Sequence, residues 1–123
     1  MDSNCRYDLQ GFSDDLGLSI EEVANLFSDL IIEIKSEIYK MKIYLNEKDL
    51  EELRRVNHNI KGISANYRIL DIYKETHTIS DALKIGDFQA LKILYQDFFI
   101  VSENAIQEIT CYFERKGLVL NKL

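Results

Sequence analysis

Residues 49–67 read DLEELRRVNHNIKGISANY, and this stretch predicts an amphipathic helix with one functional face. Asp49 is a good N-cap with Glu52 three residues later, so we expect the helix to run from Leu50 to about Tyr67. At about 100° per residue, the apolar side chains fall within an arc of roughly 80°. They are Leu53, Val56, Ile60, Ile63 and Tyr67. His58 lies roughly 170° from the centre of this arc, so its imidazole is expected to face solvent.

Two small features of this face point to chemistry at the histidine. Lys61 and Gly62 follow His58 by three and four residues, which places them on the same side of the helix. A glycine in mid-helix costs about 1 kcal/mol relative to alanine, and an outward-facing glycine gains nothing for the core. We therefore expect Gly62 to leave room for close approach of a partner to His58. The same face is expected to carry Glu51, Arg54, Arg55 and Ala65, with Lys61 to one side.

A basic segment surrounds the histidine. Between residues 54 and 68 there are four cations and no acid, in a chain of net charge -6. The cations are Arg54, Arg55, Lys61 and Arg68. Such a patch suits an anionic group on the imidazole, or an acidic pocket on a partner protein. The negative charge of the whole chain argues against a nucleic-acid binder, which needs a basic face.

The remaining sequence also predicts helices, because it contains no proline and no sustained alternation of polar and apolar residues. Ser19 and Glu22 match a capping box, so a helix is expected from there to about Leu45. Two further helices are expected at about 70–85 and at 88–116, separated by a glycine that ends the first and an aspartate that caps the second.

Apolar residues at three- and four-residue steps predict the core of these helices. They are Val23, Leu26, Phe27, Leu30, Ile34, Ile38, Met41, Ile72, Ile79, Leu83, Leu91, Leu94, Tyr95, Phe98, Ala105, Ile109 and Tyr112, and the polar Thr76 shares the same side of its helix. Four amphipathic helices with short loops predict an all-α fold, an antiparallel up-and-down four-helix bundle over residues 19–123. Residues 1–18 are expected to form a loose N-terminal arm, with a short extra helix from Asn4 to Phe12.

Several classes of function are disfavoured by the sequence. No signal peptide opens the chain and no window approaches 18 apolar residues, so we expect a cytoplasmic protein that does not enter a membrane. The glycines are isolated, which argues against a nucleotide-binding loop, and no carboxylate cluster would hold Mg²⁺. His77, the second histidine, offers His58 no further metal ligands in a recognisable spacing. We therefore expect neither metal nor cofactor.

Residues 58–66, HNIKGISAN, resemble the signature of histidine-containing phosphotransfer (HPt) domains. That signature has a histidine followed by an aliphatic residue, a lysine and a glycine, and then small residues. Flanking stretches are also similar to the family: LGLS at 16–19 ahead of a helix with Phe27, DLEELRR at 49–55, and GDFQAL at 86–91. The resemblance covers about residues 16 to 110.

The resemblance implies a free-standing phosphocarrier that relays a phosphoryl group in a multistep His-Asp phosphorelay, without ATP-binding or kinase activity of its own. His58 would be the phosphoacceptor, Lys61 would steady the phosphoryl group, and Gly62 would leave room for the docking receiver. The implied partners are a response-regulator receiver domain, a hybrid sensor histidine kinase, or both, with a monomeric carrier favoured. Two positions depart from the family. Ile63 stands where many members have serine or alanine, and Arg68 where many have glycine.

Two other functions are compatible with the same residues. The first alternative is a helical docking module that binds receivers or kinases without carrying phosphate. The second alternative is a structural helical bundle with an accidental motif, and this alternative leaves the outward-facing Gly62 unexplained. A phosphotransfer assay separates the carrier from both.

Overall fold

The computed structural model describes residues 5–120, and within them the chain forms five α-helices and no strand. The helices are α1 (Leu9–Leu16), α2 (Ile20–Glu47), α3 (Leu50–Asn66), α4 (Leu70–Ile85) and α5 (Phe88–Arg115). The all-α prediction is therefore confirmed. The predicted ends of the four long helices lie within two residues of those observed.

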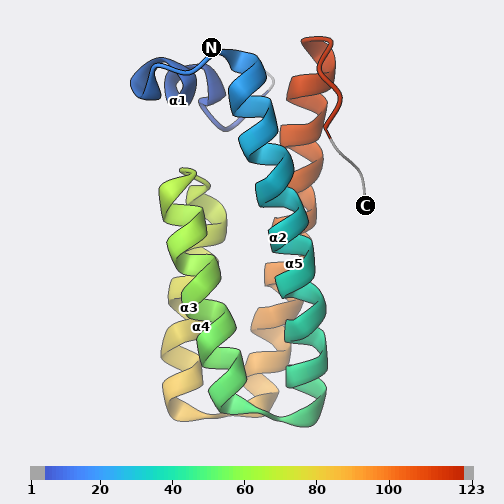
Figure 1. Cartoon of the computed structure of the whole chain (residues 1–123). Coiled ribbons are helices and arrows are strands. Elements are labelled where there is room, and N and C mark those ends of the chain that lie inside the picture. The colour runs from blue at the N-terminus through green and yellow to red at the C-terminus, as the bar shows by residue number, and fades with distance from the viewer. Residues whose placement is uncertain (1–4, 121–123) are drawn as a thin grey trace.

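The four long helices lie side by side, and each runs opposite to the one before it (Figure 1). α2 packs against α3 and α5, while α4 packs against the same two helices from the other side. Connections of two or three residues force these reversals, because so short a link can only join neighbouring helices. α2 and α5 extend past α3 and α4 at one end, and α1 lies beside α2 there (Figure 1).

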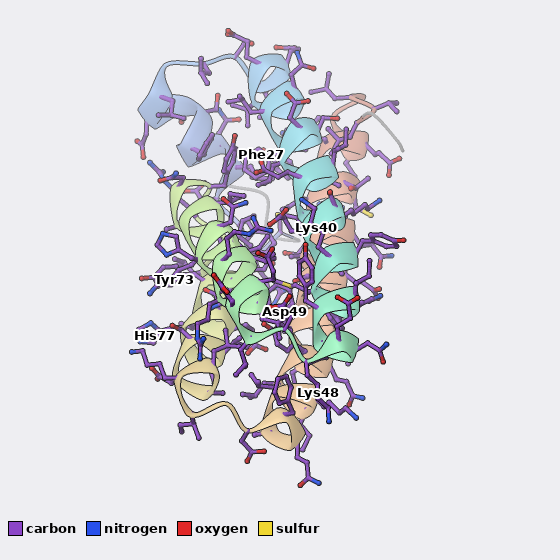
Figure 2. The ribbon with its side chains drawn as sticks, turned by 60° about the horizontal axis from the view of Figure 1, so that its bottom comes forward. Phe27, Lys40, Lys48, Asp49, Tyr73 and His77 are labelled. Carbon is purple, nitrogen blue, oxygen red and sulfur yellow. The ribbon has the colours of Figure 1, made fainter. Side chains whose placement is uncertain are left out.

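Local sequence signals set the helix ends. The Ser19 hydroxyl accepts a hydrogen bond from the Glu22 amide (3.1 Å), and the Glu22 carboxylate accepts one from the Ser19 amide (3.0 Å). These bonds lower the pKa of Glu22. At the other end, α2 closes on Lys48 in the left-handed conformation (φ 58°), directly before Asp49, the N-cap of α3 (Figure 2). The helix is thus two residues longer than predicted.

The core lies between the four long helices and contains most of the residues that periodicity predicts. Aromatic side chains fill much of it, and Phe27, Tyr95, Phe98, Tyr112 and Phe113 are fully buried. A few of the predicted core residues are only half-buried at its margin: Leu26, Ile38, Ile63, Tyr67 and Leu94.

A short N-terminal helix is present as predicted, but its predicted bounds are wrong. α1 is Leu9–Leu16 rather than Asn4–Phe12, and Asn4 lies outside the described residues. The Asp8 carboxylate accepts a hydrogen bond from the Gly11 amide (2.9 Å) and so starts the helix later than expected. A Cβ atom at Gly11 would collide with that carboxylate, which explains a glycine inside the first turn.

Residues 5–18 are also not a loose arm. The Phe12 ring is buried, stacks on Tyr67 (centroids 5.8 Å apart) and meets Phe27 edge-on (5.3 Å). The Tyr7 hydroxyl donates to the Asp71 carboxylate at the start of α4 (2.8 Å); burial, together with this bond, raises the pKa of Tyr7. The N-terminal segment therefore closes one end of the core.

We predict that Phe12→Ala lowers the free energy of unfolding by about 3 kcal/mol, because it removes a buried ring and leaves a cavity against Phe27 and Tyr67. Leu16→Ala on the same helix is the control, since that side chain is 51% exposed. Urea denaturation monitored by circular dichroism measures both. Equal effects would mean that α1 does not contribute to the core in solution.

Candidate functional site

The orientation of α3 places His58 on its outer side. Leu53, Val56 and Ile60 are fully buried, so the opposite face of the helix meets solvent. His58 is exposed, as the periodicity of the sequence predicts. His77 is also exposed but points away from the helices on the outer side of α4 (Figure 2). The two imidazoles belong to different surfaces.

The two residues flanking His58 attach α3 to its neighbours. The side-chain amide of Asn57 donates to the Thr76 carbonyl of α4 (3.0 Å), and that of Asn59 donates to the Glu37 carboxylate of α2 (3.2 Å). Glu37 is itself 4% exposed and accepts a second bond from Lys40 (3.1 Å). His58 therefore projects from a short stretch of backbone that is fixed on both sides.

Lys61 and Gly62 follow His58 by about one turn of α3. Lys61 is half-buried and faces the same hollow as His58. An ideal Cβ atom at Gly62 would meet no atom within 4 Å, so nothing in this fold requires a glycine there. Gly11, where a side chain would collide, shows the contrast. A glycine at position 62 therefore lowers the stability of α3, and the packing of the described residues gives no reason for it.

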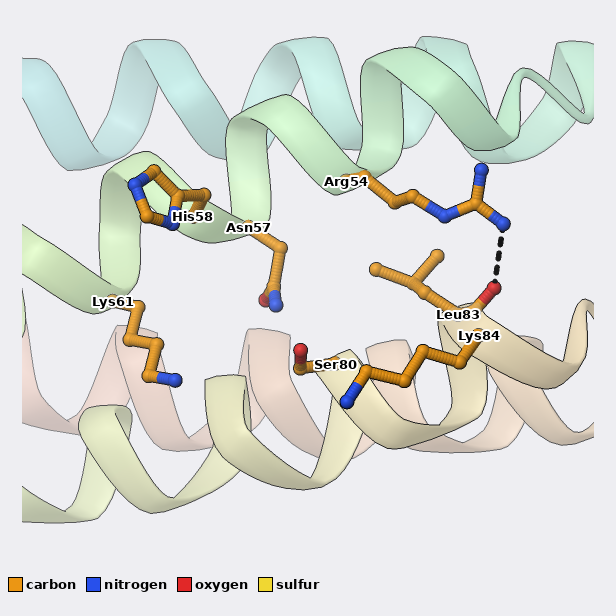
Figure 3. Close-up of a pocket in the computed structure, with 7 residues that line it drawn as sticks. All are labelled: Arg54, Asn57, His58, Lys61, Ser80, Leu83 and Lys84. Carbon is orange, nitrogen blue, oxygen red and sulfur yellow. Dashed lines mark hydrogen bonds between the residues drawn. The ribbon is translucent and has the colours of Figure 1, made fainter.

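A groove between α3 and α4 adjoins the histidine (Figure 3). Its volume is about 290 Å³, and it is lined by Arg54, Asn57, His58 and Lys61 of α3 and by Ser80, Leu83 and Lys84 of α4. No acidic residue lines it. Sequence reasoning missed the α4 wall. Ser80 and Lys84 are four residues apart and so share a helix face, but the sequence does not show that this face meets the histidine.

The remaining predicted docking residues differ in their contacts. Arg54 donates to the Leu83 carbonyl (2.9 Å), one of the carbonyls in the last turn of α4 that lack a partner within the helix (Figure 3). Arg55 pairs with Glu52 (2.8 Å), and this interaction raises the pKa of Arg55. Ala65 is exposed. An acid outside the window of residues 54–68 thus reaches into the predicted basic patch and pairs with one of its cations.

Arg68 also pairs with an acid outside this window, and that acid lies much farther away in the sequence. Its guanidinium pairs with Asp15 (2.8 Å) and lies 5.4 Å from the centre of the Phe12 ring. Its backbone is in the left-handed conformation (φ 61°), which favours glycine and costs another residue roughly 1–2 kcal/mol. Contacts to α1 help to offset this cost, so an arginine is tolerated at this corner between α3 and α4.

Other classes of site find little support in the part of the chain that is described. Residues 5–120 contain no group of three or more His, Cys, Asp or Glu side chains that would hold a metal ion. None of their helices has the length and apolar character needed to cross a membrane. Comparison with protein-family models, with curated proteins and with solved structures gives no match to this chain. The functional interpretation therefore depends on the geometry around His58.

We predict that Arg54→Ala lowers the free energy of unfolding by about 1 kcal/mol, because the Leu83 carbonyl loses its partner in the last turn of α4. Arg55→Ala is the matched control: it removes the neighbouring arginine, whose partner Glu52 lies on the same helix and is half-exposed. Thermal unfolding of both variants measures the two losses of stability. A loss for Arg55→Ala as large as that for Arg54→Ala would contradict a specific role for the bond to α4.

Proposed function

We propose that this chain is a cytoplasmic, monomeric histidine phosphocarrier of the HPt type, with α2–α5 as its antiparallel up-and-down four-helix bundle. The observation that carries the proposal is the combination of an exposed His58, a half-buried Lys61 and an open surface at Gly62 on one rigid helix face. A docking module would need no imidazole there, and a purely structural bundle would need no glycine.

The chemistry follows from the neutral imidazole, which is a competent nucleophile near neutral pH. With its proton on Nδ1, the ring attacks through Nε2 the phosphorus of an aspartyl phosphate on a receiver domain. The Nε2–P bond forms while the P–O bond to the aspartate breaks, and the electron pair leaves with the restored carboxylate. The product is an imidazolium phosphoryl group, from which the reverse step passes the phosphoryl group on to another receiver.

Lys61 supplies the charge that this transfer needs. Phosphoryl transfer depends on positioning and electrostatic stabilisation more than on covalent chemistry by the protein. The Lys61 ammonium faces the same groove as His58 and can contact the phosphoryl oxygens by charge-assisted hydrogen bonds. Any Mg²⁺ would come with the receiver, and the carrier itself would not act on ATP.

The docking surface would be the outer face of α3. Gly62 and Ala65 present little side-chain bulk, so a receiver's backbone can approach the imidazole closely. Arg54 and Arg55 lie exposed toward the start of the same helix and would meet acidic groups of a receiver or of a hybrid sensor histidine kinase.

We predict that His58→Gln abolishes phosphate uptake from a phosphorylated receiver and leaves the fold intact, because the side chain is exposed. His77→Gln is the matched control and should label as the wild type does, since His77 is the other exposed histidine. The measurement is acid-labile, base-stable phosphate on the chain, together with circular dichroism. Labelling that persists in His58→Gln would place the acceptor elsewhere.

The same experiment separates the carrier from the docking module. If the wild-type chain binds receivers but never acquires phosphate from any of those tested, the module is the better description. If phosphate appears and depends on His58, the carrier is supported.

Gly62→Leu should weaken binding of a receiver while raising the free energy of unfolding slightly, by less than about 1 kcal/mol, because the new side chain meets nothing in this fold. Gly62→Ala gives a similar gain in helix propensity with far less bulk, so it separates propensity from steric exclusion. Isothermal titration calorimetry and urea denaturation measure the two effects. Unchanged affinity in Gly62→Leu would refute the close-approach role of this position.

A further inference from the structure

The α3–α4 groove has the charge of an anion site. Arg54 and Lys61 approach from α3 and Lys84 from α4, and no carboxylate lines the groove to neutralise them. In Figure 3 the side chains of Lys61 and Lys84 extend toward the space in front of Ser80, whose hydroxyl is a further donor. Two ammonium groups converge in this way in a chain of net charge -6, while the Arg54 guanidinium lines the groove but is directed to the Leu83 carbonyl.

A buried acceptor with no partner lies in the same groove. Asn57 is 3% exposed, and its side chain points from α3 toward Ser80 (Figure 3). Its Nδ2 donates to the Thr76 carbonyl, which fixes the amide, because a flipped amide would set oxygen against oxygen. The Oδ1 atom then remains buried without a hydrogen bond. A buried acceptor without a donor is costly and marks a place where a ligand can supply one.

We propose that this groove binds a small protonated phosphoryl anion, either inorganic phosphate or a small phosphodonor such as phosphoramidate. Lys61 and Lys84 contact its charged oxygens from the two helices, and Asn57 Oδ1 accepts a hydrogen bond from its O–H or N–H group. Phosphate at neutral pH keeps at least one P–O–H group and satisfies both requirements. Sulfate has the same shape and charge but no donor, so it leaves Asn57 Oδ1 unpaired.

The binding test uses the whole chain and needs no phosphotransfer. Amide NMR spectra are recorded during titration with phosphate, and with sulfate at matched ionic strength and neutral pH. We expect phosphate to shift the resonances of groove residues and to bind about tenfold more tightly than sulfate, because sulfate cannot pair Asn57 Oδ1. Equal affinities for the two anions, or shifts outside the groove, would overturn the proposal.

A pair of lysine variants tests the α4 wall. Lys84→Ala should weaken phosphate binding about tenfold, since it removes a charge-assisted contact. Lys74→Ala should leave the affinity unchanged, because Lys74 is also an exposed lysine of α4 but lines other hollows. Both positions are exposed, so neither substitution should alter the thermal midpoint. Equal losses in the two variants would show non-specific attraction by net charge and reject the site.

A labelling experiment with phosphoramidate, which rests on the proposed function, distinguishes the two ligands. With phosphoramidate and no partner protein, Nε2 of His58 would attack the phosphorus of the N-protonated donor, the P–N bond would break and ammonia would leave with the bonding electron pair. Labelling that needs His58 and falls about tenfold in Lys84→Ala identifies a phosphodonor site. Phosphate binding without such labelling identifies an orthophosphate site. Because titration of the wild-type chain with phosphate needs no labelling of His58, failure of the groove and failure of the carrier function are told apart.

Discussion

The rotation of α3 about its own axis is the constraint on which the rest of this structure depends. Three fully buried side chains fix it: Leu53, Val56 and Ile60. Turning the helix far enough to bury the imidazole would expose all three, at roughly 1.5–3 kcal/mol for each side chain. The outward position of His58 is therefore a consequence of core packing, and no contact of the imidazole itself is needed to hold it there.

Polar contacts also fix the position of α3, in addition to the buried apolar side chains. Asn57 and Asn59 stand on either side of the histidine and bind α4 and α2 respectively. A helix held by both neighbours at one level cannot slide or turn without breaking a buried bond. His58 thus lies on a stretch of α3 that is anchored to both neighbouring helices, which would suit chemistry that depends on alignment more than on motion. The same Asn57 leaves one acceptor for the groove, so a single side chain serves both packing and the candidate anion site.

The helix ends and the face of His58 could be read from the sequence because they depend on residues close together in the chain. Ser19 with Glu22 and Asp49 with Glu52 are such local pairs, and the observed caps match them. The groove could not be read in this way, since Ser80 and Lys84 reach the histidine only through the packing of α4 on α3. A count of charges within one sequence window could not show the pairing of Arg68, because its partner Asp15 lies 53 residues away.

The conformation of Arg68 has a consequence for how the chain can be shortened. A fragment that begins at Ser19 would lose both Asp15 and Phe12, the two groups that compensate this residue for its left-handed backbone. The corner between α3 and α4 would then carry an unrelieved conformational cost, and Tyr67 and Phe27 would lose their cover. The smallest autonomous unit of this protein should therefore include the segment ahead of α2, even though the phosphoacceptor candidate lies on a different helix.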